Sequence, residues 1–139
     1  MAVHGFLLTG LGPMFPYLSE AEKRLETEYS FLFLCRAAGC VVGTFFVKVI
    51  ERYLNFHQCL SIGIGLPGVS LLLFSSTHNL NLKGLIIFIS SFGCAQINLF
   101  TNLGTIFCFR GQNIASWLQS LHGAFGIGGL IGPFLVYLF

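Results

Sequence analysis

Polar residues that could contact a solute recur along one apolar stretch, residues 84–109. The members of this stripe are Ser91, Cys94, Asn98, Thr101, Asn102 and Thr105. Positions that step by three or four share one helical face, and Gln96 falls on the opposite side. Carboxamides at membrane depth are costly and usually face a bundle interior or a watery cavity. Asn98 and Asn102 therefore either line a path for a polar solute or bond to neighbouring helices, whereas Ser91 and Thr105 favour helix bonding.

A single arginine lies inside another apolar stretch, residues 31–50. Arg36 stands beside small residues that recur every four positions, namely Cys35, Gly39 and Gly43. Small residues at this spacing let a second helix approach closely. Arg36 either snorkels to the membrane surface or faces a cavity, where it would bind a hydroxylated or anionic ligand.

Gln119 and His122 are three positions apart and so lie on one face of the last apolar stretch. A histidine can carry a proton near neutral pH, which suits a proton-coupled carrier, or it can stay neutral and bond to another helix. No second histidine or carboxylate stands at metal-site spacing, and no nucleophile–base pair is present. We therefore expect no metal, no cofactor and no enzymatic activity.

The composition is that of an integral membrane protein. The chain has 139 residues, of which 55% are hydrophobic and only 9% charged, whereas soluble domains carry roughly 25% charged residues. Half of the charged residues lie between Glu20 and Glu28. The net charge of +2 comes without a basic run, so no nucleic-acid partner is expected. The five cysteines lack a C-x-x-C spacing and are expected to be free thiols.

The apolar stretches predict an all-α membrane protein with about five transmembrane helices in one domain, residues 1–139. The expected helices cover residues 2–18, 31–50, 59–77, 84–109 and 116–139. A span needs roughly 20 residues, and barrel strands would be about half as long with strict alternation. The first stretch lacks a signal-peptide pattern and is interpreted as a span. Basic residues divide equally between the two sides and leave orientation open.

Glycine is concentrated in the last stretch, between Gln119 and Pro133. In water each interior glycine costs about 1 kcal/mol and an interior proline about 3 kcal/mol. In lipid an unpaired backbone group costs several kcal/mol, so the helix still forms. We therefore expect small residues to pack helices together. This role is assigned to Gly128, Gly132 and Pro133 in the last stretch and to Gly39 in the stretch 31–50.

Three motifs together resemble the amino-terminal half of a major facilitator superfamily transporter, in the branch of sodium-dependent glucose transporter 1 and the major facilitator domain-containing 4 proteins. They are Phe-Leu-Phe-Leu-Cys-Arg-Ala-Ala-Gly at 31–39, Glu-Arg-Tyr-Leu-Asn-Phe-His at 51–57, and Gln-Ser-Leu-His at 119–122 leading to Gly132-Pro133. The resemblance implies a cytosolic amino terminus. It also implies a cytosolic gate formed by Gly43, Glu51, Arg52 and Asn55, although Glu51 replaces the usual Asp.

The same resemblance implies a carrier of sugar or of a similar small polar solute, such as a hexose. The residues that would line its cavity are Arg36, Asn98, Asn102, Gln119 and His122. In this branch the fourth helix commonly shows an acid, three residues and an asparagine, and here Asn98 stands in the place of the acid. A neutral amide neither neutralises sodium nor carries a proton, so the departure puts coupling to either ion in doubt.

Transporters of this superfamily have two six-helix halves, with the substrate bound between them. The present sequence supplies about five helices, so we expect a fragment that needs a carboxy-terminal half and is not competent alone. We expect it to be a multi-pass protein in the bilayer of the plasma membrane. The alternative is a non-transporting membrane protein that associates with or regulates another subunit through its glycine-rich helix faces.

Overall fold

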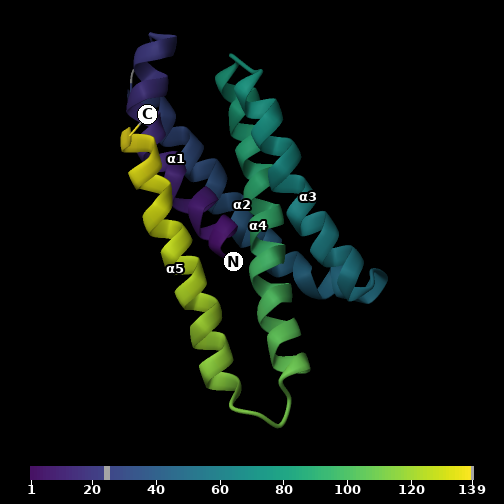
Figure 1. Cartoon of the computed structure of the whole chain (residues 1–139). Helices are drawn as coiled ribbons and strands as arrows, with labels where there is room; N and C mark the ends of the chain where they lie inside the picture. The colour runs from purple at the N-terminus through teal and green to yellow at the C-terminus, as the bar shows by residue number, and fades with distance from the viewer. Residues whose placement is uncertain (24–25, 139) are drawn as a thin grey trace. The chain divides into compact units, whose positions relative to one another are not determined.

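The computed structural model describes residues 1–23 and 26–138, and these residues form five helices joined by short connections (Figure 1). The helices are α1 Ala2–Glu22, α2 Glu26–Tyr53, α3 Phe56–Ser75, α4 Leu80–Cys108 and α5 Ile114–Leu138. No strand occurs within the described ranges. The predicted all-α membrane fold class is confirmed.

Most helices extend beyond the apolar stretches that predicted them. Helix α1 continues four residues past its predicted end at 18, and α2 begins at Glu26 instead of residue 31. Glutamate is a good helix former in water, so an apolar run marks only the part of a helix that lies in hydrocarbon. Helix α1 ends at Glu22, and its C-cap Lys23 has a left-handed φ of 52°. Phe139, at the end of the fifth predicted stretch, lies outside the described residues.

The start of α4 corrects the predicted connection over residues 78–83. Helix α4 begins at Leu80, so Lys83 is helical, and its side chain is only 2% exposed. Its Nζ lies 5.2 Å from the ring centre of Phe74 at the end of α3. The aromatic face and the burial of the aliphatic stem explain why a lysine is accommodated there.

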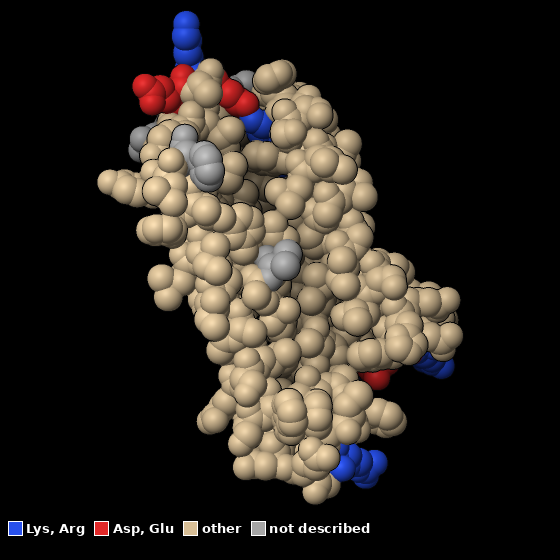
Figure 2. Space-filling view, in the orientation of Figure 1, with Lys and Arg blue, Asp and Glu red and all other residues tan. Residues whose placement is uncertain are grey.

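Among the described residues, four helices are long and apolar enough to cross a membrane, namely α2 from Thr27, α3, α4 and α5. Helix α1 is not one of them, because it contains His4, Pro13 and Pro16 and ends in two glutamates. Its predicted crossing stays a prediction. On the face shown in Figure 2, the charged side chains are few and lie near helix ends, and most of the remaining described surface is uncharged.

The chain divides into two compact units. One unit combines Met1–Glu26 with Gly104–Phe139 and is therefore built on α1 and α5. The other unit, Thr27–Leu103, contains α2, α3 and most of α4. Each unit is held together by helix contacts in which glycine allows two backbones to meet.

In the first unit, α1 and α5 run parallel. A Cβ built on Gly128 would fall on the carbonyl oxygen of Ala2, and one built on Gly132 would lie 2.9 Å from that of Phe6. The contacts advance along both helices together, which defines the parallel direction. The Thr9 hydroxyl donates a 2.8 Å hydrogen bond to the carbonyl oxygen of Gly129 across the same crossing.

In the second unit, α2 and α4 also run parallel. A Cβ built on Gly39 would fall on the carbonyl oxygen of Phe88, and one built on Gly43 would lie 2.9 Å from that of Phe92. The two crossings therefore share one design: glycines four residues apart on one helix face two carbonyl oxygens, also four residues apart, on the other. Such close backbone contact is typical of membrane helix pairs.

Helix α3 packs antiparallel on α4. Gly63 lies against Ile97, and farther along α3 the ring of Pro67 lies against Gly93, where a Cβ would be 2.8 Å from the proline Cδ. Pro67 is buried although proline weakens a helix interior. The side-chain-free face of Gly93 explains how α4 accepts the ring.

Candidate functional site

Two amides on α4 form the polar pair that the sequence singled out. Asn102 Nδ2 lies 3.5 Å from Asn98 Oδ1, at the long limit for a hydrogen bond. Asn98 is exposed and Asn102 is half-buried. The Asn102 Oδ1 atom is buried and accepts no hydrogen bond from any described residue. A buried acceptor that lacks a donor costs about 1–3 kcal/mol.

The remainder of the polar stripe divides into two parts. Ser91 and Cys94 are buried, and the main-chain oxygen of Ser91 accepts a 3.7 Å hydrogen bond from Cys40 Sγ on α2. Thr101 and Thr105 are half-buried, and the Thr101 hydroxyl donates 2.6 Å to Ile97 O of its own helix. The part of the stripe at Ser91 and Cys94 therefore serves the packing of α4 on α2. The two asparagines lie farther along α4, beyond that helix contact.

Arg36 is half-buried on α2, in the same unit as the amide pair. The preceding residue, Cys35, packs on α4: its Sγ would lie 3.1 Å from a Cβ on Gly84. Arg36 therefore flanks a tight helix contact. Its role in binding a solute stays a prediction, as does the alternative of a side chain that reaches the membrane surface.

Gln119 and His122 are both exposed, on the first turns of α5. They belong to the unit of α1 and α5, whereas Asn98 and Asn102 belong to the other unit. Among the five predicted solute-binding residues, a hydrogen bond joins the two asparagines. The contribution of Gln119 and His122 to one cavity stays a prediction.

The residues of the predicted cytosolic gate occupy different environments. Gly43 is buried in the α2–α4 crossing. Glu51 and Arg52 are exposed in the last turn of α2. Asn55 is the N-cap of α3, and its backbone N–H donates 3.1 Å to Gln58 Oε1 in a reciprocal capping box. Gly43 and Asn55 thus have clear structural positions, and gating remains a prediction for all four.

Several polar residues outside the predicted site are well placed in the structure. Gln96 is 2% exposed, and its Nε2 donates a 2.6 Å hydrogen bond to the carbonyl oxygen of Gly43. His4 is 7% exposed and meets the Phe125 ring edge-on, with ring centres 5.4 Å apart. The signal that could have found them is a lone polar residue on a face otherwise formed by glycine and apolar residues.

The chemistry available in the described residues is that of hydrogen bonding. The five cysteines are free, with Cys59 and Cys94 buried and Cys108 exposed. Within the described part of the chain, no group of three His, Cys, Asp or Glu side chains could hold a metal ion. Amide donors and acceptors recognise neutral hydroxyl groups well, because both partners keep their hydrogen bonds on leaving water.

Comparison with known proteins finds a relative among membrane transporters. The chain is 30% identical over 137 residues to Sodium-dependent glucose transporter 1A of Mus musculus. The match covers 96% of this chain and 31% of that protein, so the chain spans less than a third of its relative's length. No protein-family profile matches the chain. No solved structure matches it either. The chain is thus a multi-pass membrane protein related in sequence to part of a transporter.

Proposed function

We propose that this chain is the amino-terminal part of a secondary carrier of the major facilitator superfamily, which moves a sugar or a similar small polar solute by alternating access. The observation that carries the proposal is the Asn98–Asn102 pair, whose buried amide oxygen lacks a donor among the described residues, on a helix apolar enough to cross a membrane. Similarity to a sodium-dependent glucose transporter over nearly the whole chain supports the same assignment. In this proposal the Asn102 side chain rotates to present that oxygen to a hexose hydroxyl.

In this proposal Arg36, Gln119 and His122 complete the amino-terminal wall of the cavity. Glu51 and Arg52 act at the cytosolic gate, with Gly43 and Asn55 holding the helices that carry it. A carboxy-terminal half supplies the opposite wall, since carriers of this kind bind the substrate between two halves. The protein would act in the plasma membrane.

Ion coupling is the part of the proposal in which this chain differs most from a carboxylate-based carrier. Four of the five acidic residues lie between positions 20 and 28, and the fifth is Glu51. All five therefore lie outside the apolar stretches of the sequence. A sodium ion bound by this half would therefore be held by neutral oxygens. A proton would be carried by a histidine, such as His122.

Uptake of labelled hexose into proteoliposomes tests the proposal. We expect no uptake by the chain alone and saturable uptake when it is combined with a matching carboxy-terminal half. Asn102→Ala should abolish that uptake, while the exposed Leu130→Ala on α5 should not change it. Absence of uptake in every combination, with stable association to an unrelated membrane protein, would support the alternative of a non-transporting, regulatory subunit.

A further inference from the structure

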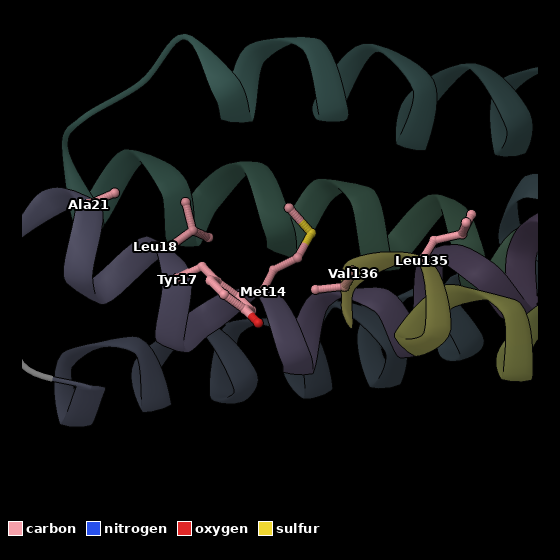
Figure 3. A pocket seen from close by; sticks show the side chains of 6 residues that line it. All are labelled: Met14, Tyr17, Leu18, Ala21, Leu135 and Val136. Atoms are coloured by element: carbon pink, nitrogen blue, oxygen red, sulfur yellow. The ribbon is translucent and has the colours of Figure 1, made fainter. Parts of the chain in front are cut away.

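An apolar cleft lies between the carboxy-terminal halves of α1 and α5 (Figure 3). Its lining residues are Met14, Tyr17, Leu18, Ala21, Leu135 and Val136. The cleft measures about 500 Å³, within the range of roughly 300–1,000 Å³ that is usual for sites that bind small molecules. None of the residues assigned to solute binding or to the gate takes part in it.

The cleft follows from the way the two helices cross. Gly132 makes the last close glycine contact with α1, at Phe6 and Gly10. Beyond it, α5 continues through Pro133 into larger side chains, and α1 contains Pro13 and Pro16. Because proline removes a backbone donor and bends a helix, close packing is not maintained past the crossing.

The lining is suited to a hydrocarbon chain. Tyr17 supplies the one polar group among the lining side chains, and it is 56% exposed, while Met14 is 39% exposed. Leu135 and Val136 lie in the last turn of α5, a helix long and apolar enough to span the bilayer. An empty apolar groove beside lipid loses dispersion contacts, and tyrosine is typical of the level at which lipid headgroups begin.

The charges beside the cleft indicate the kind of headgroup. The exposed Glu20 and the half-buried Glu22 flank Ala21 at the end of α1, and the exposed Lys23 follows as the C-cap. The carbonyl end of α1 adds partial negative charge. The described residues of α5 contain no lysine, arginine, aspartate or glutamate. The mouth of the cleft thus favours a headgroup that carries an ammonium group beside its phosphate.

We propose that the cleft binds one acyl chain of a zwitterionic phospholipid. The ammonium group of the lipid lies at Glu20 and its phosphate at Lys23, while the chain fills the space between Ala21 and Leu135. An anionic lipid such as phosphatidylglycerol has the same tail and phosphate but lacks the ammonium group. This inference is independent of the proposed transport activity.

Native mass spectrometry of the full chain, released from nanodiscs of equal parts phosphatidylcholine and phosphatidylglycerol with matched tails, tests the proposal. We expect one retained lipid, with phosphatidylcholine favoured about threefold, as one exposed ion pair would give. Ala21→Trp fills the cleft and should abolish retention. The matched control Leu130→Trp, at a site on α5 that is 77% exposed, should keep it.

A second variant separates lipid binding from folding. Glu20→Gln keeps the cleft and the helix and should retain a lipid, but the preference for phosphatidylcholine should fall to about onefold because the ion pair is lost. Equal retention of both lipids by the unmodified chain, retention by Ala21→Trp, or no retained lipid at all would each overturn the proposal.

Discussion

Gln96 and Gly43 are joined across the α2–α4 crossing by a hydrogen bond of 2.6 Å from the side-chain Nε2 to the main-chain oxygen. Only one end of the amide is satisfied, because Gln96 Oε1 is buried without a hydrogen-bond donor among the described residues. Bonds between membrane helices contribute about 0.6 kcal/mol on average, and an unsatisfied buried acceptor costs about 1–3 kcal/mol. The two effects oppose each other within one side chain.

Replacing Gln96 by leucine should therefore change the free energy of unfolding by less than about 1 kcal/mol, since the bond and the unsatisfied oxygen disappear together. Gln96→Ala should cost about 2 kcal/mol or more, because it leaves a cavity. Reversible unfolding in mixed micelles, followed by circular dichroism, measures both. Equal losses for the two variants would mean that the hydrogen bond outweighs the packed volume.

Glycines of α5 offer a matched pair of substitutions. Gly128→Ala places a methyl group on the carbonyl oxygen of Ala2, whereas a Cβ on Gly126 meets nothing within 4 Å. We expect Gly128→Ala to destabilise the first unit by about 1–3 kcal/mol through overpacking. Gly126→Ala should be neutral or stabilising, as alanine favours helix. Thermal unfolding of both variants measures this difference in stability. Similar midpoints of unfolding for the two variants would contradict the close crossing of α1 and α5.

The buried Lys83 and the Phe74 ring should be energetically coupled. The 5.2 Å separation and the 2% exposure of Lys83 fit a cation–π contact shielded from water. A double-mutant cycle with Lys83→Met and Phe74→Leu should give a coupling energy of about 0.5–2 kcal/mol. Additive losses, with no coupling, would show that other neighbours stabilise the ammonium group.

Asn55 allows a structural role to be separated from a gating role. Asn55→Ala removes the N-cap of α3 and should cost about 1 kcal/mol, while Asn55→Ser should retain the cap and the stability. Hexose uptake by the combined halves, measured for Asn55→Ser, then reports gating alone. Full uptake by that variant would limit Asn55 to capping.

Asn98→Asp restores an acid to the fourth helix in the form common to the resembled branch. In the uptake assay we expect this variant to gain dependence on sodium or pH, because a carboxylate neutralises a cation or carries a proton where an amide does neither. Asn102→Asp serves as the matched control one helical turn away. Unchanged ion dependence in Asn98→Asp would place coupling elsewhere in the carrier.

Much of the helical architecture is predictable from the sequence, because apolar length sets the number of helices that lipid can accommodate. The charged residues at the start of α2 show where this reasoning stops: they add helical turns that hydropathy does not mark. Lys83 shows the same effect at the start of α4, where a charge predicted for a loop is buried beside an aromatic ring.

The amide pair was predictable from spacing alone, since residues four apart on a helix are neighbours. The hydrogen bond from Gln96 was not, because it depends on which main-chain oxygen of another helix comes within reach. The roles of Arg36, Gln119 and His122 depend on contacts between distant segments, which periodicity within one helix does not determine.

In each contact between a glycine and a carbonyl oxygen, the two facing residues are under different sequence constraints. Gly39, Gly43, Gly128 and Gly132 must lack a side chain, but Phe88, Phe92, Ala2 and Phe6 meet them through main-chain oxygens that every residue possesses. In these four contacts the constraint falls on the glycine, and α1 contributes a reciprocal contact, since a Cβ on its Gly5 would fall on the carbonyl oxygen of Phe125. Saturation mutagenesis should find the four positions that contribute only a main-chain oxygen broadly permissive, and the glycines that face them, together with Gly5, intolerant of a side chain.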